Sequence, residues 1–222
     1  MPSTVVHVGV AVLIGTALLA KHFDLRAILI VMAVAAFPDI DTFIGLWVMD
    51  GAHRTVLHNL VFPAIALAVI WWDTRWRSRS MLRERAGDYG VRVAWVSIVA
   101  GWIVAHVLLD AFHNGVNLFW PLYDQFIDLS GQLYISDQEG LVQTFITLEL
   151  SDHGVKIAEE HRRGSTGERH YRTGVDLGPN APEDAERKFP IGDTGELFLL
   201  SITGYLVAAF RIWETEPAGP DE

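Results

Sequence analysis

Cysteine is absent from this chain of 222 residues, and basic side chains are few. Without cysteine the chain can form neither disulfide bonds nor thiolate metal sites, so any metal ion has to be held by His, Asp or Glu. The 17 Lys and Arg residues stand against 27 Asp and Glu residues, which gives a formal net charge of -10 at pH 7. No basic surface is expected for phosphate contacts, and we do not predict binding to nucleic acid.

Hydrophobic residues make up 50% of the chain, and its mean hydropathy is +0.25. This apolar content excludes a disordered protein. It is typical of a membrane protein, whereas the acidic net charge is typical of a very soluble one. The charged residues are therefore expected to be segregated from the apolar ones along the chain.

Five apolar runs predict membrane-spanning helices, since ~17 to 25 helical residues are needed to cross the hydrocarbon core of a bilayer. The second run is interrupted at Pro38, which we interpret as a tilted or broken helix. The sequence thus predicts an all-α polytopic membrane protein, a bundle of about four to five transmembrane helices with a small extramembrane insertion of α/β or β-containing structure. The apolar runs cover residues 4–20, 27–49, 56–72, 93–112 and 197–210.

The insertion lies between the fourth and fifth apolar runs and is mostly polar and acidic. Residues 132–135 and 141–150 have the composition of β-strands, and residues 164–190 are rich in Gly, Pro and charge, which predicts a loop. The predicted organisation is a membrane-embedded helical domain over 1–125, an acidic extramembrane subdomain over 126–192, a C-terminal transmembrane helix over 193–213 and a disordered tail over 214–222.

A basic loop between the third and fourth apolar runs indicates the orientation of a multi-pass protein in the cell membrane. Short loops rich in Lys and Arg stay on the cytoplasmic side. With five spans, the N-terminus and the acidic subdomain then lie outside. The loop contains Arg75, Arg77, Arg79, Arg83 and Arg85 against Asp73, Glu84 and Asp88.

Histidine and aspartate side chains are expected to gather at one face of the membrane domain, which is the outer face in this topology. His106 and Asp110 are four residues apart on a helix and share one face of it. An ionisable pair inside an apolar span is a functional hypothesis by default. Asp39 and Asp41 would point the same way if the chain is extended there. The full set is His7, Asp39, Asp41, His53, His58, His106, Asp110 and His113.

Three further expectations concern the surroundings of this set. His53 is expected in a loop and His58 in the first turn of the third span. Arg54 could hold either a phosphate group or a ligating carboxylate in a bidentate pair. The remaining histidines, His22, His153, His161 and His170, lie on polar segments without partners at ligand spacing and are expected to be solvated.

Mixed His and Asp ligands suit Zn²⁺ or another divalent first-row ion, and the candidates suffice for two ions. Such an ion lowers the pKa of a bound water to ~7 and polarises the bond that is attacked. Hydrolysis of a phosphoester at the membrane surface, such as a lipid headgroup, is the reaction we favour. Two alternatives stay open, namely a non-catalytic metal-binding membrane protein and a transporter that uses the cluster as an ion pathway. The interrupted second span favours the transporter.

The order and spacing of the motifs resemble the YdjM-like family. The motifs are a histidine near the N-terminus, the segment 37–41 (FPDID), the segment 53–58 (HRTVLH) and the segment 106–110 (HVLLD). This family is described as metal-dependent hydrolases that bind LexA and are associated with the inner membrane. The resemblance extends to about residue 125.

The resemblance implies similarity to zinc-dependent phospholipase C and to a class of zinc nucleases. It also implies a role for Asp41 as a ligand or as a support for the ligands, and we place Asp41 and Arg54 in the catalytic group. A LexA-type partner is implied by the family name alone, and because LexA is cytosolic it would not meet a cluster on the outer face. The lipid bilayer is the expected partner. The implied metal ligands are His7, Asp39, His53, His58, His106 and Asp110.

Overall fold

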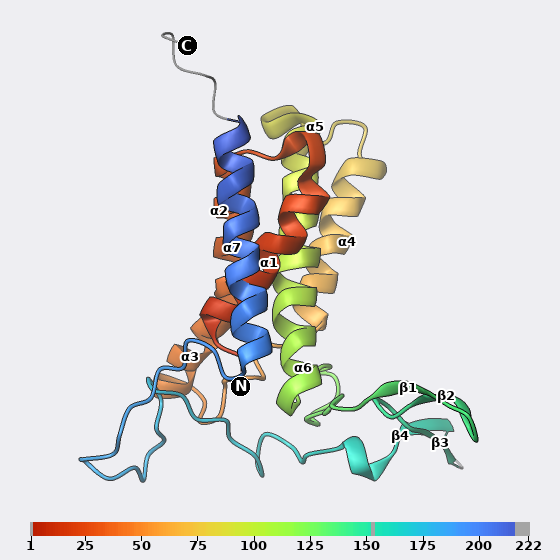
Figure 1. Cartoon of the computed structure of the whole chain (residues 1–222), viewed down its shortest axis with the longest axis vertical. Helices are drawn as coiled ribbons and strands as arrows, with labels where there is room; N and C mark the ends of the chain where they lie inside the picture. The colour runs from red at the N-terminus through yellow and green to blue at the C-terminus, as the bar shows by residue number, and fades with distance from the viewer. Residues whose placement is uncertain (1, 152–153, 216–222) are drawn as a thin grey trace. The chain divides into compact units, whose positions relative to one another are not determined.

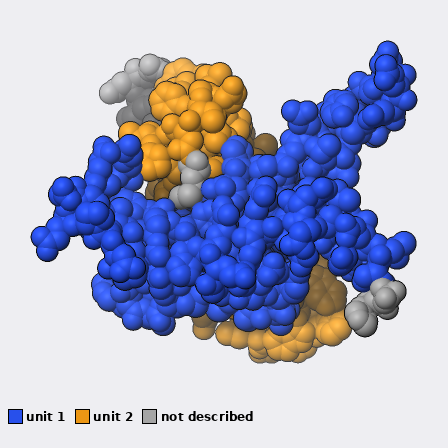
Figure 2. All heavy atoms as spheres, turned by 90° about the horizontal axis from the view of Figure 1, so that it is seen from below, with its two compact units in different colours: residues 1, 39–61, 107–189 blue, residues 2–38, 62–106, 190–222 orange. Residues whose placement is uncertain are grey.

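The computed structural model describes residues 2–151 and 154–215. These residues divide into two compact units, which Figure 2 shows in different colours. Unit 1 contains Asp39–Val61 and Val107–Phe189. Unit 2 contains Pro2–Pro38, Phe62–His106 and the chain from Pro190 onward.

Unit 2 is built from helices that run side by side (Figure 1), and α1 packs against α2, α5 and α7. Polar side chains before the apolar runs begin these helices, because Ser3, Asp24 and Ser80 each accept a hydrogen bond from a backbone N–H of the first turn. The elements are α1 (Thr4–Leu19), η1 (Ala20–His22), α2 (Leu25–Ala36), α4 (Val61–Arg75), α5 (Met81–Val96), the π-helix η3 (Ser97–Leu108) and α7 (Gly195–Thr215).

The contact between α1 and α7 depends on two glycines. A Cβ atom at Gly204 would lie 2.0 Å from the carbonyl oxygen of Gly9, and one at Gly9 would lie 2.6 Å from Cα of Ser201. Small residues at these positions let the two backbones approach closely, which is how helices associate where no hydrophobic effect drives them together.

The turn between α4 and α5 is closed by the buried carboxylate of Asp73. It accepts hydrogen bonds from the Ser80 hydroxyl at 2.7 Å and from the backbone N–H groups of Met81 at 3.1 Å and Leu82 at 3.0 Å. These contacts satisfy N–H groups that the first turn of α5 cannot bond internally, and they hold the basic segment of the chain in a tight turn.

Unit 1 is built from short helices and β-strands. It contains short helices, two β-hairpins with mostly exposed side chains, and a small core with buried Val116, Phe126 and Ile127. Val116 and Ile127 exchange backbone hydrogen bonds of 3.1 and 2.9 Å. The elements are α3 (Asp41–Trp47), α6 (Leu109–Asn114), β1 (Leu133–Ser136) paired antiparallel with β2 (Gly140–Gln143), β3 (Leu148–Ser151) paired antiparallel with β4 (Gly154–Ile157), and η4 (Glu159–His161).

Four helical stretches among the described residues are long and apolar enough to cross a membrane: Thr4–His22, Leu25–Trp47, Met81–Asn114 and Gly195–Thr215. They agree with four of the predicted spans, and the hairpins agree with the predicted β-containing insertion. The predicted third span corresponds to α4, whose 15 residues are fewer than the ~17 to 25 of a typical crossing.

Three local expectations are wrong. The third helix begins at Val61 instead of residue 56, because Asn59 Oδ1 accepts the backbone N–H of Val61 and the residues before it form bends. The segment around Pro38 is not extended, since Phe37–Ile40 forms the 3₁₀-helix η2 and Asp41 is the first residue of α3. Residues 214 and 215 belong to α7, and the rest of the predicted disordered tail lies outside the described residues.

Candidate metal centre

Unit 1 brings together six of the side chains that the sequence singled out. Asp39 lies in η2 and Asp41 opens α3, so one short helical segment carries both carboxylates. Asp110 comes from α6. The loop between α3 and α4 carries His53, Arg54 and His58. His58 precedes α4, so its predicted place in the first turn of that helix is wrong.

The carboxylate of Asp41 orients both histidines of this loop. Its Oδ1 accepts a hydrogen bond from Nδ1 of His53 at 3.0 Å, and its Oδ2 accepts from Nδ1 of His58 at 2.7 Å. Oδ2 also accepts the backbone N–H of Leu57 at 3.2 Å, and the Thr42 hydroxyl lies 3.1 Å from Nδ1 of His53. A carboxylate that engages Nδ1 leaves Nε2 as the nitrogen that can bind a metal ion.

Nε2 of His58 faces two further carboxylates. It lies 3.6 Å from Oδ1 of Asp39 and 3.5 Å from Oδ2 of Asp110. His58 is fully buried and Asp110 nearly so, while the Asp39 side chain is 24% exposed and gives the group its access to solvent. Imidazole nitrogen and carboxylate oxygen are donor types that suit a divalent first-row ion.

The electrostatics around His58 favour a positive charge on its imidazole ring. Burial alone would lower the pKa of His58, but the charge of Asp41, the contacts with Asp39 and Asp41 and the charge of Asp110 raise it to about 10. The three carboxylates therefore create a strongly negative environment in which a positive charge is favoured. A metal ion that binds Nε2 takes the place of that proton.

Arg54 fixes the position of Asp110. Its guanidinium is fully buried, and it donates from Nη2 to Oδ1 of Asp110 at 2.7 Å and from Nη1 to the Gly115 carbonyl at 2.9 Å. It also lies 4.8 Å from the centre of the Tyr171 ring. Of the two roles that the sequence suggested, the structure shows the pairing with a carboxylate. Because Arg54 holds Oδ1, Oδ2 of Asp110 is the oxygen that faces His58.

Unit 2 holds the other two predicted ligands, His7 and His106. Their imidazole rings are buried and stacked, with centroids 3.8 Å apart and planes at 20°. Nδ1 of His7 lies 2.7 Å from the Ala105 carbonyl oxygen, and Nδ1 of His106 lies 2.6 Å from that of Ala35. A backbone carbonyl at Nδ1 fixes the tautomer in which Nε2 carries the lone pair, as is usual for metal-binding histidines. That this pair and the residues of unit 1 bind the same ion stays a prediction.

The other histidines have local roles. His113 is exposed and contacts the Leu109 carbonyl of its own helix at 2.8 Å through Nδ1. His161 was expected to be solvated, but it is buried between the Asp128 carbonyl and the Thr147 hydroxyl. His170 is exposed, as expected, and its Nδ1 lies 3.1 Å from Oδ2 of Asp50. His22 lies edge-on to Tyr89, and His153 lies outside the described residues.

Sequence reasoning missed residues that support the site. Gly115 has a positive φ of 79° and ends α6, and this conformation is what glycine after a helix signals in a sequence. A Cβ atom there would lie 3.1 Å from the Ile127 carbonyl oxygen. Tyr171 stacks on Arg54 and donates its hydroxyl to the Asn114 carbonyl. No local pattern could have linked Tyr171 to residues so distant in the sequence.

Comparison with known proteins identifies the family. A family model described as "YdjM inner membrane protein" matches residues 1–167. The chain belongs to this family. The match includes every predicted ligand of the metal cluster and extends beyond residue 125, so the YdjM family covers both hairpins of unit 1 as well. Membership of an inner membrane protein family, together with the apolar helices, supports a membrane location. Among curated proteins and solved structures, none matches the chain.

Proposed function

We propose that this protein binds a divalent metal ion, most favourably zinc, and hydrolyses a phosphoester at the membrane surface. The observation that carries the proposal is the convergence of Asp39 Oδ1 and Asp110 Oδ2 on Nε2 of His58. Such a constellation of carboxylate and imidazole donors is costly to bury unless a cation or proton balances it. A bound ion would supply an activated water at neutral pH and polarise the phosphoester.

The buried residues around the proposed ion act by positioning. Asp41 is fully buried, and its two oxygens are engaged by His53 and His58. Arg54 is committed to Asp110 and Gly115. We therefore propose that Asp41 and Arg54, which the sequence placed in the catalytic group, hold the ligands in place and do not touch the substrate. The partly exposed Asp39 lies on the side from which substrate enters.

The substrate is proposed to be a phosphoester in or near the lipid headgroup layer. Two observations support this choice. The family is an inner membrane family, and Asp39, Asp41 and Asp110 fall within helical stretches apolar enough to span a membrane. The outer face is the proposed location, because the basic turn around Arg77 is expected on the cytoplasmic side.

Metal content measured by elemental analysis tests the first half of this proposal. The full chain, purified in detergent, is compared with Asp39→Asn and His58→Ala, and with His113→Ala as the matched control. His113 is an exposed histidine that contacts only its own helix in the described structure. We expect near-stoichiometric zinc in the wild type and in the control, and a loss in the other two. Full zinc retention by both site variants would contradict the proposal.

Hydrolysis of a chromogenic phosphodiester and of phospholipids in mixed micelles tests the second half. We expect turnover by the zinc-loaded protein, and loss of turnover after chelation and in Asp39→Asn. Zinc binding without turnover of any phosphoester would overturn the hydrolase and leave the non-catalytic metal-binding protein. Metal flux into vesicles in place of stoichiometric retention would favour the transporter.

A further inference from the structure

Unit 1 contains a polar cavity of about 590 Å³ beside the predicted metal ligands. One wall consists of residues 45–50, which are the end of α3 and the start of the following loop. The opposite wall comes from the loop between Val175 and Arg187. The first wall connects Asp41 with His53, whose side chains are joined by a hydrogen bond of 3.0 Å. The cavity and the candidate metal site therefore share one short piece of chain.

Asp176 is the polar group that marks this cavity as a binding site. Its side chain is 6% exposed, and Oδ1 accepts the backbone N–H of Gly178 at 2.9 Å. Oδ2 is buried and has no hydrogen-bond partner among the described residues, and Nη1 of Arg172 lies 3.8 Å from it. A buried carboxylate oxygen without a donor is costly, so a ligand that donates a hydrogen bond would be stabilised here.

Gly45 lets this oxygen pack closely against α3. A Cβ atom at Gly45 would lie 2.8 Å from Oδ2 of Asp176, which is closer than real Cβ contacts. Glycine within a helix destabilises it relative to alanine. Its presence on α3 therefore has a packing reason, which is to let the Asp176 carboxylate reach the cavity wall.

The charges around the cavity favour a cation. Its lining includes three acidic residues, Asp50, Asp176 and Glu183, and one basic residue, Arg187. Asp50 is already ion-paired with Arg172, so the negative charge left for a ligand is that of Asp176 and Glu183. Arg187 is turned to its own loop, where Nη1 donates to the carbonyls of residues 174 and 175 at 2.9 and 3.0 Å. The carbonyl end of α3, which carries partial negative charge, forms part of the wall.

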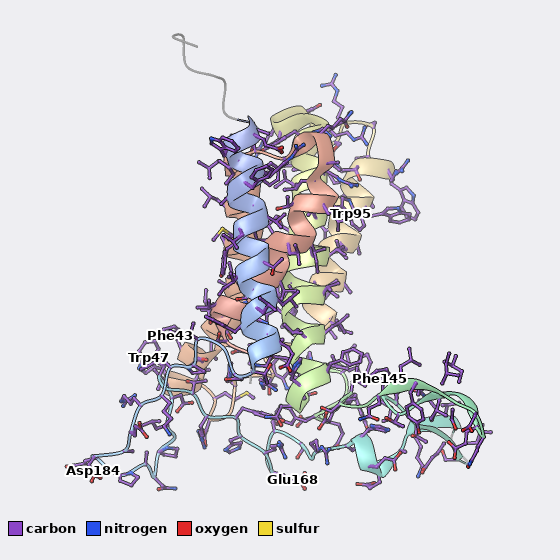
Figure 3. All side chains as sticks on the ribbon, in the orientation of Figure 1. Phe43, Trp47, Trp95, Phe145, Glu168 and Asp184 are labelled. Carbon is purple, nitrogen blue, oxygen red and sulfur yellow. The ribbon has the colours of Figure 1, made fainter. Side chains whose placement is uncertain are left out.

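Trp47 adds an aromatic side chain to the lining of the cavity. It lines the cavity and is 80% exposed, and Figure 3 shows it beside Phe43 on α3. The face of an indole ring attracts a cation. An ammonium group is the ligand that can use all three features, since it donates hydrogen bonds, carries positive charge and binds to aromatic faces.

We propose that this cavity binds an ammonium group that donates a hydrogen bond to Oδ2 of Asp176. This inference rests on the proposed hydrolase. Together they give phosphoesters of an amino alcohol, such as ethanolamine, as the substrate class. The phosphate of such a substrate would bind at the metal cluster, and its ammonium group would bind in the cavity.

Calorimetric titration with ethanolamine tests the site without requiring turnover. The zinc-loaded full chain is compared in detergent with Asp176→Asn, which keeps the shape of the side chain, and with Asp184→Asn as the control. Asp184 is an exposed acid of the same loop (Figure 3) and does not line the cavity. We expect ethanolamine to bind the wild type and the control, and at least a tenfold weaker affinity in Asp176→Asn with unchanged zinc content.

The neutral probe ethylene glycol shows whether the charge matters. Three results would each overturn the inference. They are equal binding of ethanolamine and ethylene glycol, an affinity of Asp176→Asn for ethanolamine equal to that of the wild type, and no binding of ethanolamine to the wild type. Binding of ethanolamine by a protein that hydrolyses no phosphoester would overturn the proposed function and not the cavity. Hydrolysis of ethanolamine and glycerol phosphoesters at equal rates, in wild type and Asp176→Asn alike, would overturn the cavity's role and not the hydrolase.

Discussion

Oδ2 of Asp41 and Nδ1 of His58 are joined by a hydrogen bond of 2.7 Å, and neither side chain is exposed to solvent. We expect Asp41→Asn to lower zinc affinity by about 10- to 100-fold, because an amide cannot accept hydrogen bonds from both His53 and His58. Competition with a chelator of known affinity measures the change. Asp137→Asn, an exposed aspartate in the turn between β1 and β2, should retain wild-type affinity. Wild-type affinity in Asp41→Asn would show that the carboxylate does not position the ligands.

Arg54 and Asp110 form an ion pair of 2.7 Å in which both side chains are almost fully buried. Arg54→Met should destabilise the metal-free protein by about 3–5 kcal/mol, because Asp110 is left as an uncompensated buried charge. Thermal unfolding in detergent, followed by tryptophan fluorescence, measures this loss. The double variant Arg54→Met/Asp110→Asn should recover part of it. A double variant less stable than Arg54→Met would contradict this explanation.

The glycines of α7 provide a test of the close contact with α1. Gly204→Ala should lower stability by about 1–3 kcal/mol through overpacking against Gly9, even though alanine is the better helix former. Gly195→Ala is the matched control, because a Cβ atom there has nothing within 4 Å. The control should have an unchanged or slightly higher unfolding temperature. An increase of the same size in both variants would show that α1 and α7 are not in close contact.

Asp128 gives unit 1 a pH-dependent contribution to stability. Burial raises the pKa of Asp128, but hydrogen bonds from Ser130 and Arg163 outweigh burial and lower it below its ordinary value. A carboxyl whose pKa is lowered in the folded state stabilises that state above its unfolded pKa of ~3.9, and this stabilisation is lost as the pH falls through the folded value.

Asp128→Asn should therefore unfold at a lower temperature than the wild type at neutral pH, and the difference should shrink as the pH falls below ~3.9 and through the lowered pKa of Asp128. Arg163→Gln should behave in the same way, since it removes the partner that lies 3.0 Å from Oδ2. Unfolding temperatures measured across this pH range test both variants. A difference that persists unchanged at the acidic end would mean that the charge of Asp128 is not the cause.

The helical part of the fold could be predicted because apolar runs and caps are local signals. Ser3, Asp24 and Ser80 stand directly before helices that the structure contains. The sequence predicts the start of α4 too early because Val56, Leu57 and Leu60 extend its apolar run backwards. Two contacts make α4 begin at Val61. Asn59 Oδ1 accepts the backbone N–H of Val61, and the N–H of Leu60 donates to the Leu118 carbonyl. The second of these is a tertiary contact that no periodicity encodes.

The candidate metal ligands could be predicted for a similar reason. His106 and Asp110 share a short helical segment, and the ionisable character of both stands out against apolar neighbours. Their exact partners could not be predicted, because Tyr171 on Arg54 and His161 on Asp128 depend on the path of the polar segment after α6. The cavity at Asp176 depends on the same path. Segments without periodicity give no sequence signal for where they fold back.

Asp41 and His53 are twelve positions apart, and the chain between them forms the end of α3 and a wall of the Asp176 cavity. This arrangement constrains the length of that segment from both sides. An insertion or deletion between residues 45 and 52 would move His53 away from Asp41 and change the cavity at the same time. Substitutions can therefore change the contact between Asp41 and His53 and the cavity separately, but a change in loop length alters both. We expect homologous chains with a longer loop here to lack both.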